Sequence, residues 1–431
     1  MLKDKVILGE NAIYSTDSNV TGLNNNIMVV AGSGAGKSMS VMEPRLLNTF
    51  NSSIIVTVSK RRIVEKYKSL FKERGYEVMD LNFAKPQDSN VSYDPLAYVS
   101  SFSDIRFLAQ AIIMSNPRKA NSYSDPYWDD TACSLLCAEI AFILMTEKKA
   151  TFEDVLKLND RLTIKECGYH IETSLDEGFD RLSQIEPDCF AVTCWSTFRT
   201  LPIKTASCVY GTLRTSLDSV FIPELRKMIA EKKNVEFEEL ATKKSILFVS
   251  TSAVNPALNC YVNLFYSQMF KELFEYAESL PDGKLPVPVS VLCDDFAVGS
   301  RILNFPEYIS IFREKQISVT LLIQSESQLE SMYGPTDSIT IINNCDSYIF
   351  MGCTDLRTAR NVSERLNIPL DEVLYMPIGQ TFIFRRGQKP IIAQRYNIVK
   401  DKMYKKITRK YENQILELKR TEGGKQDEKT E

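Results

Sequence analysis

The most constraining feature of the 431-residue sequence is a glycine-rich stretch at residues 29–38, VVAGSGAGKS, which directly continues an apolar run. Gly32, Gly34 and Gly36 lack a Cβ, so they allow the backbone to curl tightly and to approach a bound anion closely. The N–H groups of such a loop converge on a phosphate, and the dipole of the following helix adds positive potential. The order of strand, glycine loop, Lys-Ser and helix therefore predicts a phosphate-binding P-loop and disfavours a chance glycine loop.

The end of this loop predicts the ligand. Lys37 is expected to reach the β- and γ-phosphates of a nucleoside triphosphate, and the hydroxyl of Ser38 is expected to ligate Mg²⁺. The first glycine of the G-x-x-x-x-G-K-[ST] pattern is replaced by Ala31, which is also small. ATP and Mg²⁺ are therefore the predicted cofactors. The predicted cofactor-binding residues are Gly32, Ser33, Gly34, Ala35, Gly36, Lys37 and Ser38.

A second apolar strand, at residues 289–293, ends in two acids, Asp294 and Asp295. A buried strand holds such an acid rigidly at the carboxyl edge of an α/β sheet, where ligands bind. Asp294 is expected to hold Mg²⁺ directly or through water, and Asp295 is expected to polarise the attacking water as a general base. An Asp-Asp turn after an ordinary strand is the alternative, which the upstream P-loop disfavours. Because Asp is shorter than the Glu usual in such ATPases, either slow hydrolysis or help from another residue is expected.

Two further residues are candidates for catalysis. Gln324 follows the apolar run at residues 317–323, where a glutamine is placed to sense the γ-phosphate or to orient water. Arg313 lies just before this run, and an arginine here is placed to reach the triphosphate of an adjacent subunit. A polar residue that merely ends a strand and a solvated surface arginine are the alternatives, and the sequence leaves both open.

The chain divides by pattern into a nucleotide-binding domain and an insertion. Apolar runs of strand length alternate with helical patterns on both sides of the insertion, which predicts βαβ units in a mostly parallel central sheet. The middle of the chain has helical patterns and few strand signals. The predicted fold class is therefore α/β, interrupted by an all-helical domain. The predicted boundaries are 1–98 and 241–400 for the two parts of the nucleotide-binding domain, 99–240 for the insertion, and 401–431 for a charged helix to about residue 418 with a disordered tail.

The composition is that of a soluble globular protein and argues against several classes of protein. The formal net charge of −3 provides no global basic field, so contacts with DNA must come from local patches. Ten cysteines without a C-x-x-C pair and a single histidine, His170, argue against a zinc site and for a reducing cytoplasmic compartment. The sequence shows no signal peptide and no apolar run near the roughly 20 residues that span a bilayer, so direct membrane insertion is not expected.

Several further stretches together resemble one known family. Residues 294–299, DDFAVG, are similar to that family's Asp-Glu-Phe-Ala/Pro-x-x-Gly segment. Residues 324–329, QSESQL, with Tyr333-Gly334 are similar to its Gln-Ser-x-Ser-Gln-Leu…Tyr-Gly segment. The remaining matches lie at residues 21–26, 125–129, 343–346 and 376–379. Over most of the chain, from Gly22 to Pro390, these stretches resemble the TraG-like coupling ATPases of conjugation and type IV secretion.

The resemblance implies a RecA-like P-loop motor domain interrupted by an all-helical domain, in agreement with the organisation predicted above. It also implies a homo-hexameric ring that binds DNA and couples ATP hydrolysis to the movement of a relaxase–DNA substrate into a secretion channel. By motif position, Arg313 and Gln324 take the family's arginine-finger and sensor places.

Two departures from the family pattern bear on function. Typical members carry an N-terminal membrane anchor, whereas this sequence starts almost directly at the motor. Two alternatives follow. The first is a cytoplasmic chain that is held at the inner face of the membrane by a membrane-anchored partner from the secretion channel, and the second is a soluble variant with another function. The family's Asp-Pro-Lys-Gly segment is Val58-Ser59-Lys60-Arg61 here, which keeps Lys60 and lacks the acid.

Three functions stay open at the level of sequence. The first is a coupling ATPase that recruits and drives DNA or a relaxase–DNA complex. The second is a nucleotide-gated adaptor with little hydrolysis that recruits a protein substrate, which Asp295 favours. The third is a HerA- or FtsK-like DNA pump, which the matched segments after the two acids disfavour. Candidate DNA-binding clusters lie at residues 60–62, 232–233, 243–244 and 402–410, and a solvated helix face is the alternative for each.

Overall fold

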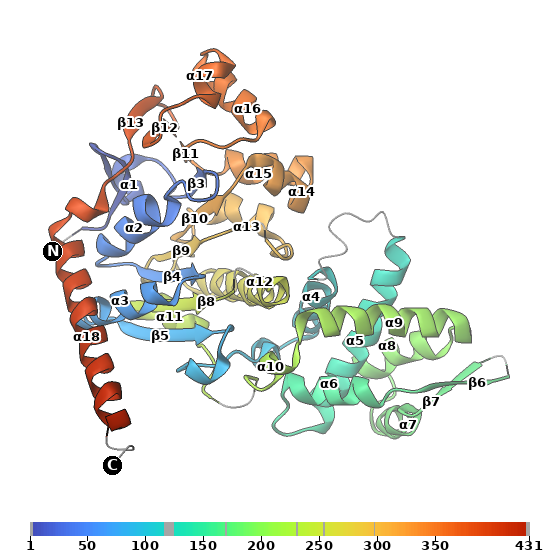
Figure 1. Ribbon diagram of the computed structural model, residues 1–431. Coiled ribbons are helices and arrows are strands. Elements are labelled where there is room, and N and C mark those ends of the chain that lie inside the picture. The colour runs from blue at the N-terminus through green and yellow to red at the C-terminus, as the bar shows by residue number, and fades with distance from the viewer. Residues whose placement is uncertain are drawn as a thin grey trace.

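The computed structural model describes residues 3–427 except 116–124, 169, 230, 231, 253, 254 and 297. It contains two bodies, a layered α/β body around a large sheet and a helical body beside it (Figure 1). Among the described residues, nine strands form the large sheet in the order β13-β12-β11-β3-β10-β9-β4-β8-β5. The neighbours from β11 to β5 are all parallel, whereas β12 and β13 extend one edge as antiparallel strands. The predicted α/β fold with a mostly parallel sheet is confirmed.

The central strands are buried on both faces because they are continuous apolar and β-branched runs. Every residue of β3, β4, β8 and β9 is buried, which is typical of a parallel sheet covered by helices. Successive side chains point to opposite faces, so Met28 belongs to one apolar cluster and Val29 to the other. The strands of the sheet are β3 (Ile27–Val30), β4 (Ser53–Val58), β5 (Glu77–Asn82), β8 (Ser245–Ser250), β9 (Val289–Cys293), β10 (Ile317–Ile323), β11 (Ser347–Phe350), β12 (Gln380–Arg385) and β13 (Ile391–Gln394).

Helices cover both faces of this sheet. One face shares an apolar cluster with α2, α3 and α18, to which Leu46, Tyr67 and Ile407 belong. The other face shares a cluster with α12 and with α13 to α16, to which Phe265 and Leu329 belong. The helices of the α/β body that follow the sheet strands are α2 (Glu43–Leu47), α3 (Arg61–Glu73), α11 (Phe237–Thr242), α12 (Pro256–Ser279), α13 (Phe305–Ile311), α14 (Glu326–Tyr333), α15 (Pro335–Asn343), α16 (Leu356–Leu366), α17 (Leu370–Leu374) and α18 (Lys402–Asp427), with α11 packed on α12 and α17 on α16.

The helical body is built around α5, a 21-residue helix that packs against α4, α6, α8 and α9. Trp195 from α8 stacks on Phe179 from α7, with the ring centroids 4.2 Å apart. One element differs from the all-helical domain that was predicted, because β6 and β7 form a short antiparallel hairpin. Strands of four residues that are mostly exposed carry too little alternation to be recognised in the sequence. The elements are α4 (Phe102–Met114), α5 (Pro126–Thr146), α6 (Phe152–Arg161), β6 (Ile164–Cys167), β7 (His170–Thr173), α7 (Asp176–Ile185), α8 (Phe190–Arg199), α9 (Ile203–Val220) and α10 (Pro223–Arg226).

The two ends of the chain pack against the α/β body. An N-terminal hairpin is formed by β1 (Lys5–Gly9) and β2 (Ala12–Ser15), and the short helix α1 (Ser18–Thr21) follows it. The hairpin contacts β13, because the Glu10 N–H donates to the Gln394 carbonyl oxygen at 2.8 Å. The C-terminal helix α18 packs against α3, where the Lys66 ammonium lies 3.4 Å from the centre of the Tyr404 ring.

Helix α18 also reaches Asp427, beyond the end expected near residue 418. The Lys, Arg, Glu and Gln residues of this stretch favour a helix, whereas Gly423 and Gly424 disfavour one. No helix in the described part of the chain combines the length and the apolar character needed to cross a membrane.

Candidate nucleotide-binding site

The glycine-rich loop joins β3 to a π-helical turn, Ser38–Met42, that continues into α2. Gly34, at φ +74°, and Gly36, at φ +90°, have backbone conformations that residues with a Cβ rarely adopt. The Gly32 N–H donates to the carbonyl oxygen of Gly352, 2.8 Å away, which ties the start of the loop to the end of β11. The loop therefore has the tight curl that lets successive N–H groups surround an anion.

Lys37 lies inside the curl of the loop. Its ammonium donates to the carbonyl oxygen of Ala31 at 2.7 Å, and 9% of the residue is exposed. Burial lowers the pKa of Lys37, and the nearby carboxylates of Asp295 and Asp294 oppose this shift. The ammonium is thus held at the loop, with the two acids as its neighbouring charges.

Asp294 and Asp295 follow β9 at the same edge of the sheet. The Ser38 hydroxyl donates to Oδ2 of Asp294 at 3.3 Å. Burial raises the pKa of Asp294 to about 6, and the charge of Asp295 adds to the shift. Asp295 has a φ of +52°, an unusual conformation for a residue with a side chain, which indicates that the surrounding structure fixes its backbone.

This pair of oxygen ligands fits a magnesium ion. A hydroxyl and a carboxylate are the hard donors that Mg²⁺ prefers, and Mg²⁺ is usually held by one or two such groups together with substrate phosphates. Among the described residues there is no cluster of three or more His, Cys, Asp or Glu side chains that would hold a metal without such help. Ser38 and Asp294 are therefore the residues that would hold Mg²⁺ beside a bound polyphosphate.

Gln324 lies on the same side of β3 as Asp294 and Asp295. It follows β10, whose last residue, Ile323, pairs with Val30 at the end of β3. Gln324, Asp294, Asp295 and the loop line one cavity of about 580 Å³. The structure thus brings together all of the predicted site residues except Arg313.

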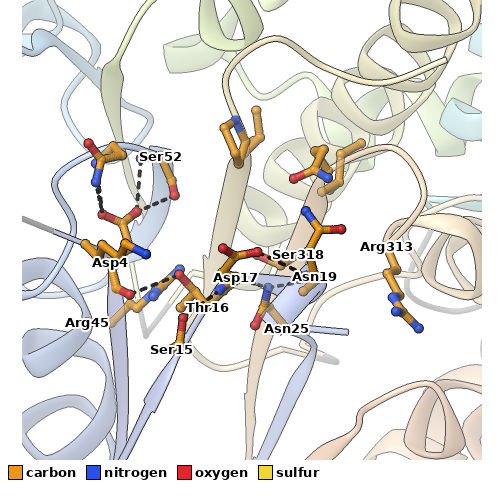
Figure 2. Close-up of a pocket in the computed structure, with 17 residues that line it drawn as sticks. Asp4, Ser15, Thr16, Asp17, Asn19, Asn25, Arg45, Ser52, Arg313 and Ser318 are labelled. Atoms are coloured by element: carbon orange, nitrogen blue, oxygen red, sulfur yellow. Dashed lines mark hydrogen bonds between the residues drawn. The ribbon is translucent and has the colours of Figure 1, made fainter. Parts of the chain in front are cut away.

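Arg313 lies at the opposite edge of the sheet. It precedes β10, whereas the loop follows the carboxyl end of the neighbouring β3, so the length of a seven-residue strand, about 23 Å, separates the two edges. Figure 2 shows Arg313 at the margin of a different pocket, with Asp17, Asn25 and Ser318 among its lining residues. Arg313 therefore has no access to the nucleotide site of its own chain.

Most of the chain matches a known protein family. Residues 1–368 match the family model described as Type IV secretory system Conjugative DNA transfer. The chain belongs to this conjugative DNA transfer family. The resemblance predicted from the sequence is therefore confirmed.

Two curated relatives carry the description Type IV secretion system-coupling protein VirD4. The protein from Bartonella henselae is 22% identical over 383 residues, which cover 87% of this chain and 58% of the relative. The protein from Bartonella quintana is 22% identical over 349 residues, which cover 79% of this chain and 52% of the relative. The chain thus spans a little over half the length of the curated relatives that it matches.

Solved structures show the same fold at low sequence identity. The plasmid coupling protein TrwB in complex with the GTP analogue GDPNP matches with a TM-score of 0.70 and 14% identity, covering 92% of this chain and 89% of that one. TrwB in complex with ADP and Mg²⁺ matches with a TM-score of 0.70, 15% identity and the same coverage. VirB4 of Thermoanaerobacter pseudethanolicus matches with a TM-score of 0.58 and 12% identity, covering 93% of this chain and 98% of that one. These similarities support the RecA-like P-loop fold.

In this member of the conjugative DNA transfer family, the segment that replaces the Asp-Pro-Lys-Gly pattern contributes charge to the site. Lys60 and Arg62, which follow β4, are exposed and line the same cavity as the glycine loop. Arg61 between them instead forms an ion pair with Asp80. The rule that parallel strands end at one edge of a sheet was the signal that would have placed Lys60 and Arg62 here.

The other basic clusters make contacts within the chain. Lys232 donates to the carbonyl oxygen of Ser89, and Lys233 and Lys243 both pair with Glu239, at 3.7 and 3.2 Å. In α18, Lys410 pairs with Glu73 at 2.6 Å. These contacts agree with the alternative of structural, solvated helix faces for these lysines.

One residue near the loop was missed by the sequence patterns. Nη1 of Arg395 lies 3.1 Å from the position that a Cβ on Gly36 would take. Arg395 follows the edge strand β13, and no motif marks it in the sequence.

Proposed function

We propose that this chain is a coupling ATPase that binds ATP with Mg²⁺ and uses it to drive DNA or a relaxase–DNA complex toward a type IV secretion channel. The observation that carries the proposal is the convergence of Lys37, Ser38, Asp294 and Gln324 on one cavity, in a chain of the conjugative DNA transfer family. TrwB, whose fold is similar, has been captured with nucleotide and with ADP and Mg²⁺.

The roles of the side chains follow from their positions. The loop amides and the Lys37 ammonium would bind the β- and γ-phosphates, with Lys37 exchanging the Ala31 carbonyl for phosphate oxygen. Ser38 and Asp294 would hold Mg²⁺, which neutralises charge that develops on the phosphates. Asp295 would orient the attacking water, and Gln324 would contact the γ-phosphate or that water.

Arg313 suggests how hydrolysis depends on assembly. Because it lies at the sheet edge away from its own nucleotide site, a role as an arginine finger requires a neighbouring subunit. We therefore propose a ring of identical subunits, six in number as the family resemblance implies, in which Arg313 of one subunit reaches the nucleotide of the next. Membership of the conjugative DNA transfer family supports a place at the inner face of the membrane beside an anchored channel partner.

A second function is favoured by Asp295. Its carboxylate is shorter than that of Glu, and its backbone is fixed at φ +52°. The shorter side chain limits how far it reaches toward a water molecule, so a nucleotide-gated adaptor with little hydrolysis is the competing proposal. The family match disfavours a HerA- or FtsK-like pump.

The deciding experiment measures ATP binding and ATP turnover separately, with and without single- and double-stranded DNA, beside a Lys37→Ala variant. Turnover that DNA stimulates and that the variant lacks supports the coupling ATPase. Binding without turnover supports the adaptor. Absence of ATP binding by the wild-type chain contradicts both proposals.

A further inference from the structure

The antiparallel hairpin of β12 and β13 at one edge of the sheet places the guanidinium of Arg395 beside the glycine loop. Strand β3 is parallel to β11, β11 is antiparallel to β12, and β12 is antiparallel to β13, so β13 runs in the same direction as β3. The residue that follows β13, Arg395, therefore emerges at the same edge of the sheet as the loop. It approaches from the side of β3 that is opposite to β10 and β9.

The guanidinium of Arg395 packs directly on the loop. A Cβ built on Gly36 would lie 3.1 Å from Nη1 of Arg395, a distance at which a neighbouring atom must give way. The backbone of Arg395 is fixed at this place, because its N–H donates to the Gly379 carbonyl oxygen at 2.7 Å. A Cβ on Gly379 would in turn lie 3.9 Å from Nη2, so two glycines leave room for this one side chain.

Arg395 differs from the other arginines of the hairpin in its lack of partners. Within the described residues its guanidinium makes no ion pair and no hydrogen bond, although the residue is half-buried. Arg386, by contrast, pairs with Asp346 at 3.1 Å, and Arg385 lies 3.8 Å from the centre of the Tyr14 ring. A half-buried, unpaired cation beside a loop of converging N–H groups is placed to bind an anion.

The strand order indicates which part of a nucleotide this cation meets. The acids that follow β9 and the glutamine that follows β10 lie on one side of β3, where hydrolysis of the terminal phosphate would occur. A polyphosphate that lies across the end of β3 would then direct its α-phosphate and ribose toward β11, β12 and β13. Arg395 stands on that side.

We propose that Arg395 is a nucleotide-binding residue that donates to the α- and β-phosphates, so that it holds ADP as firmly as ATP. The inference rests on the proposed nucleotide-binding function of this site. It distinguishes Arg395 from Lys60 and Arg62, which lie after β4 on the side of the terminal phosphate.

The test is a titration of the full chain with fluorescent ADP and fluorescent ATP in the presence of Mg²⁺. We expect Arg395→Ala to weaken both ligands to a similar extent, by about tenfold or more, as for the loss of a charge-assisted hydrogen bond. Arg395→Lys should restore part of the affinity, because it keeps the charge. Lys389→Ala, an exposed cation in the turn of the same hairpin, is the matched control and should bind like the wild type.

A thermal melt of the ligand-free variants separates binding from support of the loop. We expect Arg395→Ala to keep the melting temperature of the free protein and to show a smaller increase with ADP than the wild type at the same ADP concentration. Unchanged affinity for ADP, or a loss confined to ATP, would overturn the inference while the proposed function stands. The inference would also be overturned if the ligand-free Arg395→Ala variant melted at a lower temperature and Arg395→Lys did not restore it. Absence of binding by the wild-type chain would overturn the inference together with the proposed function.

Discussion

The Ser38 hydroxyl donates a hydrogen bond to the carboxylate of Asp294 across 3.3 Å, although 256 positions separate the two residues along the chain. The bond joins the first helical turn after the glycine loop to the end of β9. Since β9 and β3 are separated only by β10 in the sheet, the two halves of the predicted magnesium site are held together by the sheet itself. The inserted helical body leaves this arrangement intact, because it leaves the sheet after β5 and returns before β8.

The first prediction concerns the charge of Asp294. Its pKa of about 6 lies above the value of about 3.9 for an unfolded Asp, so between these pH values the folded chain binds more protons. The free energy of unfolding of the ligand-free protein should therefore fall as the pH rises from about 4 to about 6. Asp294→Asn should reduce this slope, although Asp94, whose pKa is also raised to about 6, still contributes to it. The variant should stabilise the free protein at pH 8 by up to about 3 kcal/mol, as measured by denaturant unfolding.

The same variant should lose Mg²⁺-dependent nucleotide binding, and in the wild type this binding should weaken below about pH 6 as Asp294 becomes protonated. A pH-independent Mg²⁺ requirement in the wild-type chain would argue against Asp294 as the ligand. Asp17→Asn, which alters an acid in the pocket at the other sheet edge, is the control.

The second prediction concerns the length of Asp295, the proposed general base. Asp295→Glu should raise the rate of ATP hydrolysis, by about tenfold if the short side chain limits proton transfer to the carboxylate. Nucleotide affinity should change little, because Asp295 is assigned no contact with the phosphates. A steady-state assay at saturating ATP measures the effect. If the rate stays the same, the short acid is not the cause of slow turnover.

The third prediction tests Arg313 by mixing subunits. Arg313→Ala and Lys37→Ala should each be inactive as pure assemblies. The first lacks the arginine that would reach the neighbouring nucleotide, and the second lacks a functional nucleotide site. In a mixture, an intact loop in an Arg313→Ala subunit can meet an intact Arg313 from a Lys37→Ala neighbour. ATPase activity should then reappear, to about a quarter of the wild-type level in an equimolar mixture. A mixture as inactive as its components would exclude action between subunits.

The fourth prediction compares two glycines of the loop. Both have positive φ, but a Cβ on Gly34 meets no atom within 4 Å, whereas one on Gly36 meets Arg395. Gly34→Ala should cost about 1 kcal/mol of unfolding free energy from backbone strain alone. Gly36→Ala should cost about 2–3 kcal/mol, and adding Arg395→Ala should recover part of the difference. If the two single variants lose the same unfolding free energy, the Arg395 guanidinium moves away from the added Cβ without strain.

Much of the site was predictable because its parts are local. The glycine loop, the two acids and Gln324 each end an apolar run, and parallel strands bring such ends to one edge. The same rule, applied to β4, would also have placed Lys60 and Arg62. For Arg313, the sequence predicts only a candidate position before β10. Its proposed role depends on a contact with a second subunit, which the sequence of one chain does not specify.

Arg395 was not predictable, because its position depends on two successive antiparallel pairings at the sheet edge. Strand β12 has a buried apolar centre, but β13 has four mostly exposed residues that give little periodic signal. The hairpin of β6 and β7 escaped prediction for the same reason. In each case the pairing is set by contacts between distant parts of the chain and leaves little trace in local pattern.

Helix α3 gives the nucleotide cavity a mechanical connection to the far end of the molecule. Its first turn carries Arg62 at the cavity, and its last residue, Glu73, is paired with Lys410 of α18. Thirteen helical residues make a stiff rod of about 20 Å. Because α18 packs along this rod, a change in the tilt of α3 would shift the surface on which α18 rests, and the two helices would move together.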